Sequence, residues 1–320
     1  MSFFPTNFRR AAALLGAAVL AGQPLAAQTA PAAVHSAVAR VELDLLKKNM
    51  RYLAHTARLA DADRREQARR ELVADAPVAD LPAAGPDQPP LGAAARRLAA
   101  AVRAVQQTDY KHVNDLVVYR SNSLEAMQAF LQANAAAQQK VVLLLDSLET
   151  ARAAFAEEFS LRQDVTRQLV GWVRVTRQVA ALSEYYPRVM LPCLRVQVAV
   201  RALQTAVEGH DYPGFEKARL RLLDATRQSA AELAPVDAFM SLDLAFRDAG
   251  RAFVAEHAAS AGKLTQVSAL LRRATSLSAS EQQTVDNGLT DYFQQTVRLG
   301  HEIDKAGQTF MDSNAPSLIP

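Results

Sequence analysis

A histidine, an aspartate and a tyrosine stand side by side in the stretch GHDYPGF, residues 209–215. An imidazole beside a carboxylate is a common arrangement for general acid–base catalysis. The same stretch also fits the corner between two helices. Gly209 suits the left-handed cap that ends one helix, Asp211 suits the N-cap of the next, and Pro213 is tolerated in its first turn. Because each unusual residue has such a role, we interpret the stretch as a structural corner that includes Tyr212.

The other residues that could carry chemistry are isolated. Asp109 and His112 lie three residues apart, a weak metal-pair pattern that also fits a hydrogen-bonded surface pair. Ser260 and Lys263 have the spacing of a serine nucleophile and its lysine base, but the partner motifs of those enzymes are absent. The chain has no Glu-x-x-His pair of a di-iron bundle and no glycine-rich phosphate loop. The sequence therefore predicts no catalytic residue, metal site or cofactor.

Apolar residues recur at helical spacing along the elements that would position these side chains. Val34, Val38, Val41 and Leu45 step by four, three and four residues, which predicts an N-terminal helix within residues 28–73. Residues 74–92 contain five prolines and two glycines. Proline removes a backbone donor and disfavours a helical residue before it, so this segment is predicted to be an extended connector.

Residues 93–320 are predicted to form the main bundle. Asn122 followed by Glu125 is a capping-box pattern that indicates a break between long helices. One helix is expected to end at Pro187, and another to begin after Pro192 and reach Glu208. Trp172, the only tryptophan, lies on an apolar stripe and is expected to be a core residue.

Two more helices are expected, one starting near Pro235 and Asp237 and a last one starting at Ser280. Glycine and proline are few outside the connector, and no strand pattern competes with the helical one. The predicted fold is all-α, an antiparallel bundle of long helices joined by short turns and one Pro-rich connector.

Residues 1–27 have the layout of a cleaved secretory signal peptide. Arg9 and Arg10 precede a short apolar run, and Leu25-Ala26-Ala27 ends the segment with small residues. The run is shorter than the roughly 20 residues that span a bilayer. No cysteine lies near the cleavage region, so a lipid anchor is excluded. We expect an exported protein, periplasmic or associated with the cell surface, that does not span the membrane after cleavage.

The composition of residues 28–320 argues against a nucleic-acid-binding protein and excludes a fold held by intrachain disulfides. Residues 28–320 contain 34 basic and 33 acidic side chains, too balanced for a nucleic-acid surface. Cys193 is the only cysteine, so no intrachain disulfide can form, and its default role is that of a small buried hydrophobe. The fold must therefore be held together by its hydrophobic core.

The C-terminal part, residues 185–318, resembles a family of bacterial helical surface proteins known from leptospires and common in Bacteroidota. The resemblance rests on Asp211 and Tyr212 before a helix, on the segments 233–239 (Leu-x-x-x-Asp-x-Phe) and 243–249 (Asp-x-x-x-Arg-Asp-Ala), and on Phe310 with Asn314. It implies a location and a helical fold, and it implies no reaction.

The predicted function is that of an exported, non-enzymatic helical bundle that binds a protein partner or a small ligand in a groove between helices. The alternative is a periplasmic enzyme or metal-binding protein whose site is assembled from distant single residues. The absence of local catalytic motifs favours the first hypothesis.

Overall fold

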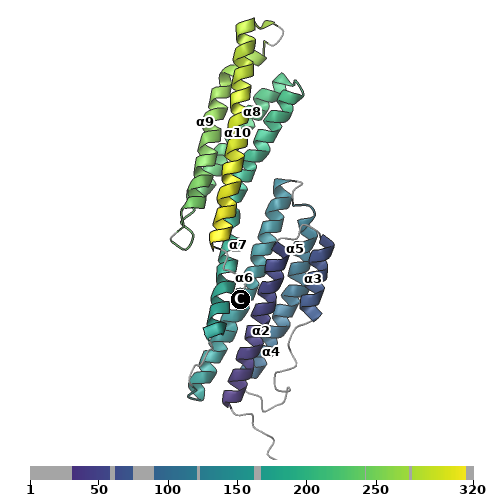
Figure 1. Cartoon of the computed structure of the whole chain (residues 1–320), viewed down its shortest axis with the longest axis vertical. Helices are drawn as coiled ribbons and strands as arrows, with labels where there is room; N and C mark the ends of the chain where they lie inside the picture. The colour runs from purple at the N-terminus through teal and green to yellow at the C-terminus, as the bar shows by residue number, and fades with distance from the viewer. Residues whose placement is uncertain are drawn as a thin grey trace, which may run out of the picture.

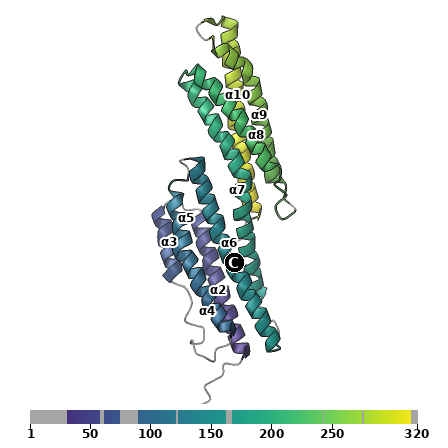
Figure 2. The same ribbon diagram turned by 180° about the vertical axis from the view of Figure 1, so that it is seen from behind.

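The computed structural model describes residues 31–57, 62–74, 90–120, 123–161, 167–241, 243–273 and 276–314. The predicted signal peptide and most of the Pro-rich connector lie outside these ranges. The described residues form helices, turns and one isolated bridge, which confirms the predicted all-α class. The molecule is elongated and has two bundles arranged end to end along its longest axis (Figures 1 and 2).

One long helix, α7 (Arg167–Glu208), belongs to both bundles. Its N-terminal half packs with α2 (Pro31–Ala57), α3 (Ala62–Ala74), α4 (Pro90–Ala104), α5 (Tyr110–Val117) and α6 (Leu124–Glu158). Its C-terminal half packs with α8 (Tyr212–Leu233), α9 (Ala245–Leu271) and α10 (Ala279–Asn314). We call the region where the two bundles meet along α7 the waist; α10 ends close to it (Figure 1).

The N-terminal segment packs on the rest of the chain as two helices. The predicted stripe of Val34, Val38, Val41 and Leu45 is buried against α4 and α6. The prediction of one helix over residues 28–73 was wrong, since α2 ends at Ala57 and α3 begins at Ala62. Both helices contact neighbouring elements, so residues 31–74 belong to the N-terminal bundle.

The next three elements follow one another almost without a break. After α4 the backbone widens into one turn of π-helix, η1 (Val105–Asp109), and continues as α5. The predicted interruption before α6 is present, but the N-cap is Ser123, whose side chain accepts a hydrogen bond from the Ala126 amide at 3.1 Å. Asn122, the predicted cap, lies outside the described residues.

The predicted break at Pro187 and Pro192 was wrong, because α7 runs through both prolines. Each proline leaves one carbonyl of the preceding turn without its helical donor, which normally kinks or ends a helix. Here both prolines are buried, and neighbours such as Val189 and Cys193 pack into the C-terminal core. Tertiary packing therefore outweighs the local preference.

The C-terminal bundle is built on close approach of α7 and α9. A Cβ at Gly250 would lie 2.8 Å from a methyl group of Val189, so glycine is needed where the two helices cross. The predicted helix start near Pro235 was wrong: the described residues between 234 and 244 lie outside any helix, and α9 begins at Ala245. The last helix begins at Ala279, one residue before the predicted start, with a capping box between Ser278 and Glu281.

Candidate functional site

The stretch GHDYPGF forms the corner between α7 and α8. The Asp211 carboxylate accepts a hydrogen bond from the Gly214 amide at 2.9 Å, which makes it the N-cap of α8. Pro213 lies in the first turn, and Tyr212 is half-buried against the C-terminal core. These side chains hold the corner, and nothing in their geometry forms an acid–base pair.

The role predicted for Gly209 at this corner is wrong. The residue with left-handed backbone is His210, with φ of 53°. The amide of Asp211 donates to the carbonyl of Ala206 at 2.9 Å, and that of His210 donates to Val207 at 3.1 Å. This pair of bonds is the Schellman motif, with His210 in the position that glycine usually takes. Gly209 precedes it and closes the last helical turn.

The isolated residues considered from sequence also have structural partners. Asp109, the last residue of the π-helix, forms an ion pair with Lys140 of α6 at 2.6 Å, while His112 lies on α5. The Ser260 hydroxyl donates to the Glu256 carbonyl and to Gln295, each at 2.8 Å, and so does not point at a base. No group of three or more His, Cys, Asp or Glu in the described part of the chain is placed to hold a metal ion.

Cys193 is buried as the sequence predicts, whereas Trp172 lies at the edge of the core and not inside it. Burial raises the pKa of the Cys193 thiol to about 12, so the reactive thiolate is not formed at neutral pH. Trp172 is half-buried and packs against the core formed by α2, α3, α5, α6 and α7. Neither residue contributes a reactive group.

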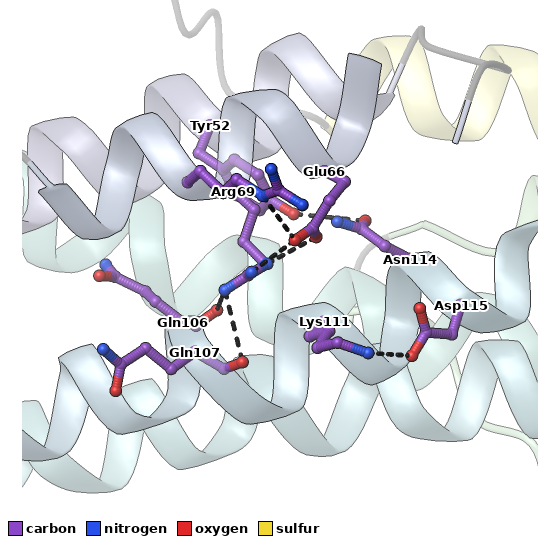
Figure 3. A network of polar contacts seen from close by, with 9 residues as sticks. Tyr52, Glu66, Arg69, Gln106, Gln107, Lys111, Asn114 and Asp115 are labelled. Carbon is purple, nitrogen blue, oxygen red and sulfur yellow. Dashed lines mark hydrogen bonds and ion pairs between the residues drawn. The ribbon is translucent and has the colours of Figure 1, made fainter. Parts of the chain in front are cut away.

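A polar network in the N-terminal bundle joins α3 to the π-helix (Figure 3). Arg69 donates twice to Glu66, at 2.7 and 2.5 Å. It also donates to the carbonyls of Gln106 and Gln107, at 3.3 and 3.4 Å. A π-turn displaces carbonyls from their α-helical donors, and Arg69 supplies donors in their place. The guanidinium is used in holding this turn, so we assign the network a structural role.

Four residues of the family-like motifs come together at the waist. The Asn314 side chain donates to the Asp243 carboxylate at 2.7 Å. The rings of Phe239 and Phe310 meet edge to face at 5.3 Å between centroids, and both contact Tyr185 of α7. Contacts between segments that are far apart in sequence therefore hold Phe239 and the end of α10 against α7. We call these contacts, together with the Asn314–Asp243 hydrogen bond, the clasp.

This clasp holds a strained loop. Phe239 and Asp243 form an antiparallel bridge, and between them Met240 and Ser241 have φ of 48° and 63°. Residues other than glycine rarely adopt this left-handed backbone conformation, which costs about 1–3 kcal/mol per residue. Met240 is 61% exposed. The clasp thus holds an exposed methionine at the waist.

Met240 borders a cavity of about 710 Å³ between α6 and α7. Sites for small molecules typically enclose about 300–1,000 Å³ and have mostly apolar walls with a few polar groups. Here the apolar walls come from both helices, and the polar groups are three arginines, a glutamate and a glutamine. The lining residues are Glu149, Arg152, Ala153, Leu169, Val170, Val173, Arg174, Arg177, Gln178, Ala181 and Met240.

The three arginines of the cavity differ in their partners. Arg177 binds Asp146 at 2.7 Å and Glu149 at 2.5 Å. Arg174 is exposed and makes no ion pair with any described residue. Arg152 is only 7% exposed and forms a very short ion pair with Glu42 of α2. The cavity therefore has a buried guanidinium at one side and a free, solvated one at its mouth.

Glu42 is fully buried behind Arg152. Burial raises the pKa of Glu42 to about 7, although Arg152 acts in the opposite direction. Burial and the nearby charge of Arg152 lower the pKa of His35, which lies two turns before Glu42 on the same face of α2. Sequence analysis missed Glu42 and Arg152. The available signal was a charge inside an apolar stripe: Glu42 between Val41 and Leu45, and Arg152 between Leu148 and Phe155.

A second cleft, of about 650 Å³, lies between α8 and α9. Its most buried cation, Arg251, already donates to the carbonyls of Leu233, Ala234 and Val236. The waist cavity is therefore the better candidate, since it alone of the two has a buried charge that is not held by backbone carbonyls.

Comparisons of the chain with protein-family models, curated proteins and solved structures find no match. The resemblance noted from sequence stays a prediction. No helix in the described ranges combines the length and apolar character needed to cross a bilayer.

Proposed function

We propose that this protein is exported and acts without catalysis, binding a small amphipathic ligand in the waist cavity. The observation that carries the proposal is a nearly buried guanidinium, that of Arg152, in the wall of a mostly apolar cavity of about 710 Å³. A buried charge in a cleft is costly and is typical of ligand sites. The signal-peptide pattern of residues 1–27 supports export.

The lining supports binding rather than covalent catalysis. Among the described residues that border the cavity there is no serine, threonine, cysteine or histidine. Its one carboxylate, Glu149, is paired with Arg177. Nucleophilic and acid–base mechanisms need such groups within hydrogen-bond reach of each other. The wall instead offers apolar contact and cationic hydrogen-bond donors, which is the chemistry of recognition.

The test uses two adjacent alanines of α6. Ala153 lines the cavity, whereas Ala154 is exposed and does not. Phenylalanine at position 153 should fill the mouth of the cavity, while Ala154→Phe adds the same ring on a neighbouring face. Both variants carry the same cost in helix propensity. Octanoate and octanamide are titrated into residues 28–320 by calorimetry and by the fluorescence of Trp172, which neighbours Val173 in the wall.

We expect Ala153→Phe to weaken binding of either probe by at least about tenfold, which corresponds to losing one well-buried contact, and Ala154→Phe to leave it unchanged. If neither probe binds the unmodified protein, or if both variants behave alike, the cavity is not a ligand site.

A further inference from the structure

The guanidinium of Arg152 uses only part of its hydrogen-bonding capacity. Arg152 donates to Glu42 through Nη1, and it makes no other hydrogen bond among the described residues. A guanidinium carries five N–H donors in a planar fork. The side chain is only 9% exposed, yet it forms part of the cavity wall. One edge of a buried cation therefore faces the cavity with unused donors.

Glu42, the other member of the pair, also has a hydrogen-bonding atom without a partner. Its Oε2 accepts from Arg152, while its Oε1 is buried without a hydrogen-bond partner. The charged groups that act on it are Arg152 and Glu149, both from α6. The α4 and α7 side chains that pack around this part of α2, such as Leu98 and Leu169, are apolar. The pair is therefore weakly solvated and incompletely satisfied.

We propose that the waist cavity takes a monoanionic acid head-first, with its carboxylate docked on the free edge of Arg152, and that Glu42 takes up one proton as the acid binds. This inference rests on the proposed function and names its ligand class: an aliphatic or aromatic carboxylic acid.

The geometry favours a carboxylate over other head groups. The planar fork of arginine matches the two oxygens of a carboxylate, and such bonds are among the strongest in proteins. A cationic head would meet Arg152, Arg174 and Arg177 in the same wall. A phosphate dianion would bring two negative charges close to Glu42 and Glu149. Arg174 at the mouth is exposed, so water and salt screen its attraction for any head group.

The proton balance follows from placing two carboxylates on one buried guanidinium. Before binding, Arg152 carries one positive charge and Glu42 one negative charge. After binding, the ligand carboxylate pairs with Arg152, and like charges at short range disfavour a second ionised carboxylate. Glu42 has the less solvated position, and burial already raises its pKa to about 7. The proton comes from solvent, and no covalent bond forms or breaks.

Calorimetry of residues 28–320 at pH 8 tests both parts. Octanoate and octanamide are each titrated in phosphate and in Tris, two buffers with different ionisation enthalpies. We expect octanoate to bind at least about tenfold more tightly than octanamide, as for a hydrogen bond to a charged group. The apparent enthalpy for octanoate should differ between the buffers by an amount that corresponds to uptake of up to about one proton. Octanamide should show no such difference.

Three variants locate the effect. Glu42→Gln should bind octanoate without proton uptake and at least as tightly as the unmodified protein. The double variant Glu42→Gln/Arg152→Gln removes both buried charges together, and it should bind octanoate no better than octanamide. Arg201→Gln removes an exposed cation of α7 outside the cavity; it is the control and should retain proton uptake. Each variant is checked for a native circular dichroism spectrum and a cooperative melt.

The outcomes separate the two proposals. If neither probe binds, the proposed function fails and this inference fails with it. Equal binding of octanoate and octanamide leaves the cavity as a ligand site but overturns head-first docking on Arg152. Preference for octanoate with no proton uptake, or with the same uptake in Glu42→Gln, overturns the role of Glu42.

Discussion

The buried acid Glu42 should make the N-terminal bundle less stable as pH rises, opposite to the behaviour of most paired carboxylates. Burial raises its pKa from an ordinary value of 4.5 to about 7. The folded protein therefore binds more protons at this site than the unfolded chain does between these values. By linkage, the stabilising contribution is fully present below pH 4.5 and is lost as pH rises through 7.

The magnitude follows from the size of the pKa shift. A shift from 4.5 to about 7 corresponds to about 3 kcal/mol of unfolding free energy. The side chain is fully buried, so solvent screening does not reduce this figure. Glu42→Gln keeps the shape but cannot titrate. We expect the unfolding free energy of the unmodified protein, minus that of Glu42→Gln, to fall by about 3 kcal/mol between pH 4 and pH 8.

Urea unfolding followed by the fluorescence of Trp172 measures this difference, because the only tryptophan packs on the N-terminal core. Glu158→Gln, an exposed acid near the end of α6, controls for the loss of one surface charge. A difference that stays flat or rises with pH would refute the reasoning. It would mean that the ion pair with Arg152 outweighs desolvation and keeps Glu42 ionised when folded.

Three other predictions follow from single sites. Asp211→Ala should lower the unfolding free energy by about 1 kcal/mol, measured by thermal melting, because α8 loses its N-cap; Asp211→Asn should restore most of it. Burial lowers the pKa of His257 to about 4, so the unfolding free energy of the unmodified protein, minus that of His257→Phe, should rise by about 3 kcal/mol between pH 4 and pH 6.5 in urea unfolding. N-terminal sequencing of exported protein should begin at Gln28 or within a few residues.

Much of the fold could be predicted from sequence because helical periodicity is a local property. The stripe from Val34 to Leu45 and the corner at Asp211 depend on residues a few positions apart. The missed features depend on distant neighbours. Pro187 and Pro192 stay helical because the residues around them pack into the C-terminal core, and the segment before α9 is held by the bridge between Phe239 and Asp243.

The candidate site was missed for the same reason. Glu42 and Arg152 are 110 residues apart in sequence, and neither belongs to a motif of fixed spacing. A charge within an apolar stripe usually lies on the solvated edge of a helix, and only the packing of α2 against α6 places this one inside. The sequence shows which charged residues lie within an apolar stripe, but only the structure shows the partner with which each one forms an ion pair.

The position of the cavity along α7 explains why its features gather there. Leu169 and Val173 belong to the N-terminal core, and Leu182 and Tyr185 belong to the C-terminal one. The turns between them line the cavity, so it lies where one core stops before the next begins. Interiors elsewhere are close-packed, and a gap between two cores is where a ligand can be held without displacing core side chains.

The C-terminal bundle closes this gap with polar contacts. Gln178 of α7 donates to the backbone carbonyl of Asn314 at 2.7 Å, and the Asn314 side chain holds Asp243 of the strained loop. Gln178, which lines the cavity, is thus linked through Asn314 at the end of α10 to the loop that carries Met240. Arg152 of the buried pair borders the same space from α6. A ligand in the cavity would contact both bundles at once, which gives a physical reason for joining them through one unbroken helix.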